Sequence, residues 1–373
     1  MADYRIISSD NHVIEPPDLW TNRIDSKFKS REPHVVRLPD GSDRWFTDGI
    51  KGQGMFAGSQ AGVRFDEPEN LSTLFTFEEV RPGGYIPEEQ IKDMAIDGID
   101  VSILYPTVGL QLFCTVPDSE LLSATFRAYN DWLSEFCSPF PNQLKGIAMV
   151  NVDDVQDGIS ELERSAKMGL VGAMITIYPH ADSPYDSPIY EPFWAAAQDL
   201  EMPLSLHITT NRPGPGQQYM DLDTVKSSFL CNTDHWVRMS LADMIYSGVF
   251  ERYPKLMVGS VEQELSWVPH FLDRLDYNYT QRAVGDNSYR FKGDSIPSDF
   301  YHSNVFLGFQ EDALGIRDRY IIGVDKLLWG SDYPHQESTF PRSREIIEEI
   351  LVDCTEEEKS KIAGGNSARV YRL

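Results

Sequence analysis

The sequence predicts an α/β fold, namely a single (β/α)8 (TIM) barrel with a large insertion after its first strand. Eight runs rich in apolar and β-branched residues recur along the 373-residue chain, and near-continuous apolar runs of this kind are typical of buried parallel strands. Segments with the apolar spacing of helices separate several of these runs. No glycine-rich dinucleotide fingerprint follows the first strand, which argues against the competing doubly wound sheet. We therefore expect the barrel.

The predicted strands share a length typical of strands and an apolar core. They span residues 4–10, 101–107, 144–151, 172–177, 203–208, 255–261, 304–309 and 326–332. Four segments between them have the helical spacing of apolar residues, and these span 119–136, 155–168, 190–199 and 237–250. In a barrel of this kind the carboxyl ends of all strands meet on one face, where the active site lies.

Residues 13–86 do not fit a minimal barrel. The segment is rich in Pro, Gly and charged residues, with a short strand-like run at 45–47 and no long helical pattern. An insertion at this point would lie over the carboxyl ends of the strands. We therefore interpret 13–86 as a lid or substrate wall within one domain of residues 1–373, with simple decoration as the alternative. Its aromatic residues suit a ring-bearing substrate, although aromatic insertions also pack on themselves; they are Trp20, Trp45, Phe46 and Phe56.

The chain is strongly acidic, since 33 Lys and Arg residues stand against 58 Asp and Glu residues and give a formal net charge of −25. This excess repels phosphate backbones, so we expect neither nucleic acid nor an anionic membrane surface as a partner. An anionic small molecule remains compatible, because a bound cation reverses the local field. The simplest interpretation of the charge is a solvated acidic surface that aids solubility.

Two features of the sequence indicate a cytoplasmic protein. No apolar stretch approaches the roughly 20 residues that span a bilayer, and the amino terminus lacks the basic and apolar regions of a signal peptide. The cysteines show no CxxC spacing, so we expect free thiols rather than disulfides or a thiolate metal site; they are Cys114, Cys137, Cys231 and Cys354.

Ligand-type side chains stand at the ends of several predicted strands. Asp10 and His12 end the first strand, and their spacing of two places both side chains on one face. His207 ends the fifth strand, Glu262 follows the sixth, and Asp332 ends the eighth. Each alone has a simpler interpretation, such as a helix-capping Asp or a hydrogen-bonded core His. Together, at carboxyl ends that meet on one face, they predict a single metal centre.

The donor types indicate which metal and which chemistry to expect. Imidazoles combined with carboxylates suit Zn²⁺, which we take as the first expectation, with Mn²⁺ or Fe²⁺ as alternatives. Such a site leaves a position open for water or substrate. A bound metal lowers the pKa of water from ~16 toward ~7 and so generates hydroxide near neutral pH. Asp332 can both touch the metal and take a proton from that water.

These motifs resemble the amidohydrolase superfamily. The D-x-H pair, the strand-five His207 and the run Gly330-Ser331-Asp332-Tyr333-Pro334-His335 carry the resemblance. It is closest to the branch that includes aminocarboxymuconate-semialdehyde decarboxylase and the resorcylate-type decarboxylases. Further similar stretches extend it over residues 5–345, and these are 93–100, 247–254, 267–269 and 274–276.

The resemblance implies metal ligation by four residues, which are Asp10, His12, His207 and Asp332. Glu262 departs from the pattern, because decarboxylases of this branch have a His at that strand-six position, where it activates water or protonates the substrate. The carboxylate can act as a general base, contact the metal, help hold a second ion, or orient a ligand His. These alternatives stay open at this point.

Two neighbouring residues complete the candidate site. His335 lies three residues past Asp332, and we expect it to face the same cavity and to bind substrate or shuttle protons. Glu264 stands where relatives with an acid at position 262 often have Gly, and the sequence offers no account of that difference.

The leading functional hypothesis is a metal-dependent hydrolase that directs metal-activated water at an ester, thioester, amide or lactone of a small, ring-bearing substrate. Asp332, Glu262 and His335 would then manage the protons. The alternative is metal-dependent, non-oxidative decarboxylation of an aromatic or unsaturated carboxylic acid. Glu262 in place of His tilts the prediction toward hydrolysis. We expect a small molecule as the substrate, and a homo-oligomer by analogy with similar barrels.

Overall fold

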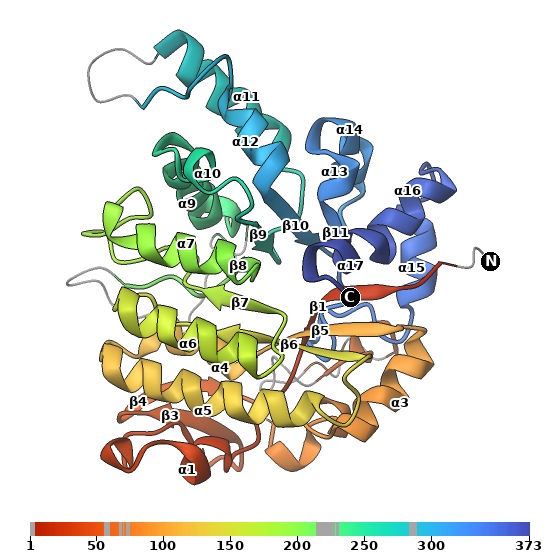
Figure 1. Ribbon diagram of the computed structural model, residues 1–373. Helices are drawn as coiled ribbons and strands as arrows, with labels where there is room; N and C mark the ends of the chain where they lie inside the picture. Colours follow the sequence, from red (N-terminus) through yellow and green to blue (C-terminus); the bar gives the residue numbers. More distant parts are fainter. Residues whose placement is uncertain are drawn as a thin grey trace.

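Eight parallel strands form the centre of the molecule, and helices surround them (Figure 1). The computed structural model describes residues 4–55, 60–66, 69, 71, 75–213, 228, 231–282 and 289–373. Neighbouring strands follow the order β1-β5-β6-β7-β8-β9-β10-β11. Their bounds are β1 Ile7–His12, β5 Val101–Tyr105, β6 Leu144–Met149, β7 Gly172–Ile175, β8 Leu204–His207, β9 Val258–Val261, β10 Val305–Phe309 and β11 Leu327–Trp329. Each overlaps a predicted strand, and the predicted (β/α)8 barrel is confirmed.

The last strand returns to the first and brings the barrel close to closure. The backbone N–H of Asp332 donates to the carbonyl of Asp10 at 2.8 Å, and the hydroxyl of Ser9 donates to the carbonyl of Leu328 at 3.1 Å. Gly330 makes this approach possible, because a Cβ there would lie 2.7 Å from the Cβ of Asp10. The two halves of the predicted site therefore meet through the backbone.

Most helices pack an apolar stripe against the outside of the barrel. The longest, α5 (Ser119–Cys137), begins at Asp118, whose carboxylate accepts from the N–H groups of Glu120 and Leu121. The other described helices of eight or more residues are α3 Pro87–Asp97, α4 Val108–Thr115, α6 Val155–Lys167, α7 Glu191–Asp199, α9 Asp234–Tyr246, α11 Val268–Tyr277, α12 Pro297–Asn304 and α15 Ser343–Ile350.

One predicted helix is divided in the structure. The helical pattern over 237–250 corresponds to α9 and to the first residues of a separate short helix, α10 (Val249–Arg252). Gly248 lies between them with φ of 75°, a left-handed conformation that ends a helix and favours glycine. Apolar periodicity continues across this break, which is why the pattern alone did not reveal it.

The insertion carries a small antiparallel sheet of its own. Its strands are β2 (His34–Arg37), β3 (Asp43–Thr47) and β4 (Ile50–Gly54), so the strand expected at 45–47 is part of β3. Asp48 and Gly49 join β3 to β4 with φ of 52° and 75°, as in the tight turns whose twist matches that of a hairpin.

Strand β4 packs on α4 (Val108–Thr115), the helix that follows β5. The lid interpretation of 13–86 stays a prediction.

Two of the insertion's aromatic residues attach it to the barrel. Trp20, on α1 (Leu19–Arg23), is buried, and its indole N–H donates to the carbonyl of Thr125 on α5 at 3.0 Å. Trp45 packs edge-on against Trp20 with ring centroids 5.3 Å apart. These rings serve packing rather than contact with a substrate, because both are buried among the insertion and α5. Phe56 lies outside the described residues.

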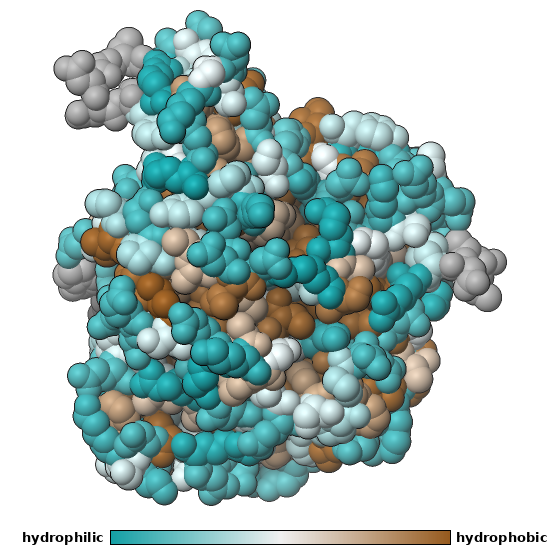
Figure 2. Space-filling view, in the orientation of Figure 1, coloured by the Kyte–Doolittle hydropathy of each residue, from teal (hydrophilic) through white to brown (hydrophobic). Residues whose placement is uncertain are grey.

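The outer surface is largely hydrophilic on the face seen in Figure 2, with hydrophobic residues gathered in scattered patches. Among the described residues, no helix is long and apolar enough to cross a membrane. All four cysteines are free, which confirms the expectation of thiols, and three of them are buried.

A carboxyl group on α9 gives the fold a testable pH dependence. Burial, together with the charge of Asp186, raises the pKa of Asp243 to about 7 from its ordinary value of 3.8, and its Oδ2 atom has no hydrogen-bond partner. The folded protein therefore keeps this proton at pH values where the unfolded chain has lost it. The contribution of Asp243 to stability is therefore most favourable below its ordinary pKa of 3.8 and is lost as the pH rises from there through about 7. We expect Asp243→Asn to raise the Tm by about 2 °C more at pH ~8 than at pH ~4.5.

Asp186→Asn provides the matched control, because it removes only the neighbouring charge. It should reduce the pH dependence without abolishing it, since burial is the larger cause of the raised pKa. Thermal unfolding at the two pH values measures both effects. An equal Tm change for Asp243→Asn at both pH values would contradict the prediction.

Candidate metal centre

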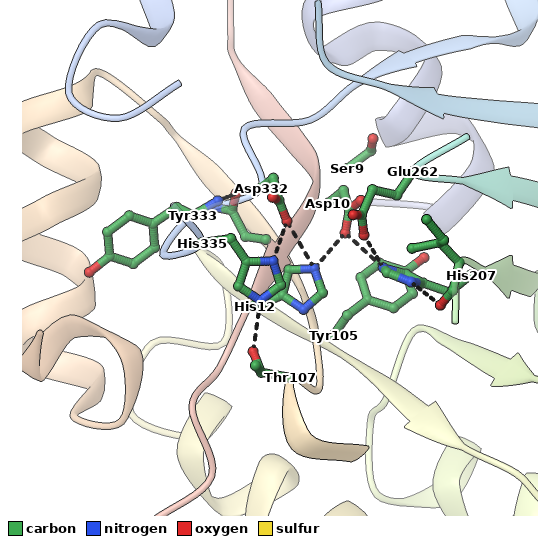
Figure 3. Close-up of polar contacts among 12 residues, drawn as sticks. Ser9, Asp10, His12, Tyr105, Thr107, His207, Glu262, Asp332, Tyr333 and His335 are labelled. Carbon is green, nitrogen blue, oxygen red and sulfur yellow. Dashed lines mark hydrogen bonds and ion pairs between the residues drawn. The ribbon is translucent and has the colours of Figure 1, made fainter. Parts of the chain in front are cut away.

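The carboxyl ends of four strands bring the predicted ligands together (Figure 3). Nε2 of His12 lies 3.3 Å from Oδ1 of Asp10 and 3.2 Å from Oδ1 of Asp332. Nε2 of His207 lies 3.6 Å from the same Asp10 oxygen and 3.4 Å from Oε2 of Glu262. Side chains from β1, β8 and the loops after β9 and β11 thus converge on one point. The structure brings together all five predicted metal ligands.

Backbone geometry turns two of these side chains into the barrel mouth. Glu262 and Asp332 follow β9 and β11 with φ of 65° and 62°. Left-handed backbone of this kind costs about 1–3 kcal/mol for a residue other than glycine and is concentrated at functional sites. Thr209, just past β8, has φ of 63° as well. Left-handed residues therefore follow three of the strands, β8, β9 and β11, at the carboxyl face of the barrel.

The free atoms of this cluster fit a divalent cation. Nδ1 of His12 donates to the carbonyl of Pro106 at 2.8 Å, and Nδ1 of His207 faces the carbonyl of Ile208 at 3.2 Å. Each imidazole therefore presents the lone pair of Nε2 to the cluster. The facing atoms are buried and have no hydrogen-bond partner; they are Asp10 Oδ1, His12 Nε2, His207 Nε2, Glu262 Oε2 and both carboxylate oxygens of Asp332. Imidazole nitrogen and carboxylate oxygen are common ligands of divalent transition metals.

The electrostatics of the cluster favour a bound cation. Burial acts to raise the pKa of Asp10, but the facing imidazoles of His207 and His12 hold it below its ordinary value. Burial and the charges of Asp332 and Asp10 raise the pKa of Glu262 well above its ordinary value. Crowded carboxylates of this kind favour binding of a positive ion, which would stabilise all of them in the charged form.

His335 faces the cluster, as expected. Its Nδ1 atom lies 2.9 Å from Oδ1 of Asp332, and its ring stacks on that of His12 with centroids 4.0 Å apart. On the other side, its Nε2 atom is hydrogen-bonded to the hydroxyl of Thr107 at 3.0 Å. The ring is therefore held between a carboxylate and a hydroxyl group, in an orientation that keeps Nδ1 toward Asp332.

Sequence reasoning missed three residues at this site. Thr107 had only one signal, its position at the end of the second predicted strand. Glu15 is buried and accepts from the N–H groups of Val108 and Gly109, both at 2.9 Å, which fixes the start of α4 beside Thr107. Glu337 places a carboxylate oxygen near those of Glu262 and Asp332, and only its position shortly after Asp332 could have identified it.

Glu264 lies apart from the cluster and contacts the loop after β10 instead. Its carboxylate accepts from the backbone N–H groups of Gln310 at 3.3 Å and Glu311 at 3.4 Å. Burial and the charge of Asp312 raise the pKa of Glu264 to about 7. The side chain therefore joins the loop after β9 to the loop after β10 and has a structural role.

Comparison with known proteins gives a family and several relatives. The family model described as Amidohydrolase matches residues 73–279 and 317–373, more than two thirds of the chain. Gamma-resorcylate decarboxylase of Polaromonas sp. is 24% identical over 300 residues, which cover 77% of this chain and 88% of that protein. The decarboxylase orsB of Emericella nidulans is 30% identical over 267 residues, which cover 66% of this chain and 76% of that protein.

Solved structures share the fold over the whole chain. The amidohydrolase map2389c from Mycobacterium avium subsp. paratuberculosis superposes with a TM-score of 0.80 at 21% identity, covering 100% of this chain and 99% of that one. Dihydroxybenzoic acid decarboxylase from Polaromonas sp., with bound manganese and 2-nitroresorcinol, gives a TM-score of 0.66 at 20% identity, covering 99% and 97%. Both proteins therefore share the barrel fold with this chain, although their sequence identity to it is low.

The preference for hydrolysis drawn from the sequence is wrong. Both relatives named above are decarboxylases, and one of them is 30% identical to this chain. The preference depended on Glu262 standing where His is usual. That exchange does not discriminate between the two reactions, because a carboxyl group holds and delivers a proton as an imidazole does.

We expect His12→Ala and His207→Ala each to weaken the tightest Mn²⁺-binding step by about 100-fold, because each removes a buried nitrogen that has no other partner. Titration of the metal-free chain with Mn²⁺ measures the effect. His302→Ala is the matched control, since His302 lies exposed on α12 and should leave binding unchanged. Unchanged affinity in either site variant would contradict the assignment of these residues as ligands.

Proposed function

The chain belongs to the amidohydrolase family, and we propose that it is a metal-dependent, non-oxidative decarboxylase of a small aromatic carboxylic acid. The observation that carries the proposal is the cluster of unpartnered imidazole nitrogens and carboxylate oxygens at the barrel mouth. The decarboxylase relatives support the reaction. The resemblance to the amidohydrolase superfamily drawn from the sequence is confirmed.

Asp10, His12, His207 and Asp332 are proposed to hold the metal, with Glu262 beside them. This donor set suits Mn²⁺ as well as Zn²⁺, and the manganese in the Polaromonas decarboxylase supports Mn²⁺ as the first ion to test. When bound, the ion supplies a Lewis acid that polarises an oxygen of the substrate. Because its ligands are almost fully buried, little water competes for the site, and the electrostatic interactions there are strong.

Decarboxylation requires a proton at a defined place. The bond between the ring carbon and the carboxyl carbon breaks, its electron pair stays on the ring carbon, and that carbon takes up a proton as carbon dioxide leaves. Asp332 and His335 are proposed to hold this proton, since Nδ1 of His335 lies 2.9 Å from Oδ1 of Asp332. Thr107, bonded to Nε2 of the same ring, keeps His335 in the orientation that the transfer needs.

Glu262 is proposed to complete the wall opposite His335. Its Oε2 atom lies 3.4 Å from Nε2 of His207, so it can share the metal with that imidazole. An acidic surface does not prevent an anionic acid from entering, because the bound cation provides the local attraction. A homo-oligomer, a cytoplasmic location and a lid formed by 13–86 stay predictions.

We expect the Mn²⁺-loaded protein to release carbon dioxide from at least one member of a panel of hydroxylated benzoic acids. A parallel panel of esters, thioesters and lactones should give no turnover. Carbon dioxide release and hydrolysis are measured separately on the same preparation. Hydrolysis of an ester without carbon dioxide from any acid would contradict the proposed function.

Glu262 and Glu264 allow a comparison of two acids on one loop. We expect Glu262→Gln to lower kcat by about 100-fold, since it removes a titratable carboxyl group that faces His207 at the proposed reaction site. Glu264→Gln should leave kcat within about twofold, because its carboxylate bonds only to the loop after β10. Steady-state kinetics on the substrate found in the panel measure both. Unchanged kcat in Glu262→Gln would reduce Glu262 to a structural role.

A further inference from the structure

Helix α4 lies along the edge of the barrel mouth, and one of its sides faces the loops that follow the strands. Just before its first residue, Thr107 is hydrogen-bonded to His335 in the loop after β11 at 3.0 Å. Near its other end, Sγ of Cys114 lies 2.7 Å from the carbonyl oxygen of Thr209, in the loop after β8. Residues three, four and seven apart share one side of a helix, so Gln111 lies on this same side, between Thr107 and Cys114. Gln111 therefore faces the barrel mouth.

The insertion supplies a partner for Gln111. Its Nε2 atom donates to Oε1 of Gln53 on β4, and the two side chains are 8% and 7% exposed. Within the described part of the chain, Nε2 of Gln53 and Oε1 of Gln111 have no partner, yet both atoms are open to solvent. Amide groups buried this deeply are usually bonded throughout, because an unsatisfied polar group is costly. The Gln53–Gln111 pair therefore presents one free donor and one free acceptor, a number that stays the same when both amides are rotated by half a turn.

We propose that the Gln53–Gln111 pair selects substrates with a neutral hydroxyl group on the side of the ring away from the metal. This inference rests on the proposed function. A hydroxyl group accepts one hydrogen bond and donates another, so it matches Nε2 of Gln53 and Oε1 of Gln111. From Thr107 to Gln111 the helix rises by about 6 Å. A ring whose carboxylate lies beside His335 can therefore reach the pair with a substituent in the meta or para position.

The pair discriminates against other substituents at this ring position. A second carboxylate has no proton to donate, so Oε1 of Gln111 would face another acceptor. Neither amide carries a positive charge that would offset the burial of an anion. A hydrogen atom at the same position leaves both amide atoms without a partner from the substrate, which weakens binding. The insertion and α4 therefore act together in the choice of substrate.

Binding of nitro analogues tests the pair, because a nitro group in place of the carboxylate cannot leave as carbon dioxide. The full chain loaded with Mn²⁺ is titrated by calorimetry with 2-nitrophenol and with 4-nitroresorcinol, which has a second hydroxyl group para to the nitro group. We expect 4-nitroresorcinol to bind about 10-fold more tightly, as two hydrogen bonds of ordinary net strength imply. A third probe, 3-hydroxy-4-nitrobenzoic acid, has a carboxylate at that position and should bind no more tightly than 2-nitrophenol.

Gln53→Met and Gln111→Met should each lower the ratio of the two dissociation constants from about 10 to below about 3. Methionine keeps the length of the side chain and removes the amide, and a ratio is insensitive to a general loss of affinity. The substitutions lie on different elements, β4 and α4, so failure of one variant to fold leaves the other as the test. Gln156→Met, which replaces an exposed amide on α6, is the matched control and should keep the ratio.

Three results would overturn the inference: equal binding of the two phenols by the wild type, an unchanged ratio in either folded site variant, or a preference for the carboxylate probe. Release of carbon dioxide from the acid panel tests the proposed function separately. If acids are decarboxylated but the ratio does not respond to the substitutions, only this inference fails. If the ratio responds as expected and no acid is decarboxylated, the pair still binds the hydroxyl group and only the proposed function fails.

Discussion

The site depends on the backbone contact between the first and the last strand of the barrel. Asp10 and Asp332 stand near opposite ends of the sequence, and the N–H of Asp332 donates to the carbonyl of Asp10 at 2.8 Å. This contact requires a residue without a side chain at Gly330, since a Cβ there would collide with Asp10. Without it, His12 would lose one of the two carboxylates that face its Nε2 atom. The backbone contact that closes the barrel therefore also brings the two parts of the cluster together.

A series of packing contacts and hydrogen bonds connects the insertion to His335. Trp20 and Trp45 anchor the insertion on α5, and β4 packs on α4. Glu15 then holds the first N–H groups of α4 in place, which is a favourable position for a carboxylate at a helix amino terminus. Because Thr107 lies at that same point, the hydroxyl that orients His335 is fixed by the insertion as well as by the barrel.

Periodicity and position at strand ends were enough to predict the barrel and most of the candidate site. Eight apolar runs indicated the barrel, and parallel strands place their carboxyl ends on one face, so Asp10, His12, His207 and Asp332 were expected together. Thr107 and Glu15 were missed because their roles depend on hydrogen bonds between segments far apart in the sequence. The break at Gly248 was missed because apolar spacing does not report backbone handedness. The reaction was misjudged because one exchange, His to Glu at position 262, was given chemical meaning without knowledge of its neighbours.

Those neighbours change what a carboxylate at position 262 means. In isolation, an acid in place of an imidazole suggests a base that activates water. In the structure, Glu262 faces His207 on one side and shares a group with Asp332 and Glu337 on the other. A side chain in that position lies among other carboxylates, and burial together with the charges of Asp332 and Asp10 raises its pKa. The carboxylate at position 262 therefore lies where it can affect the charge of the proposed metal site, and its presence alone does not identify the reaction.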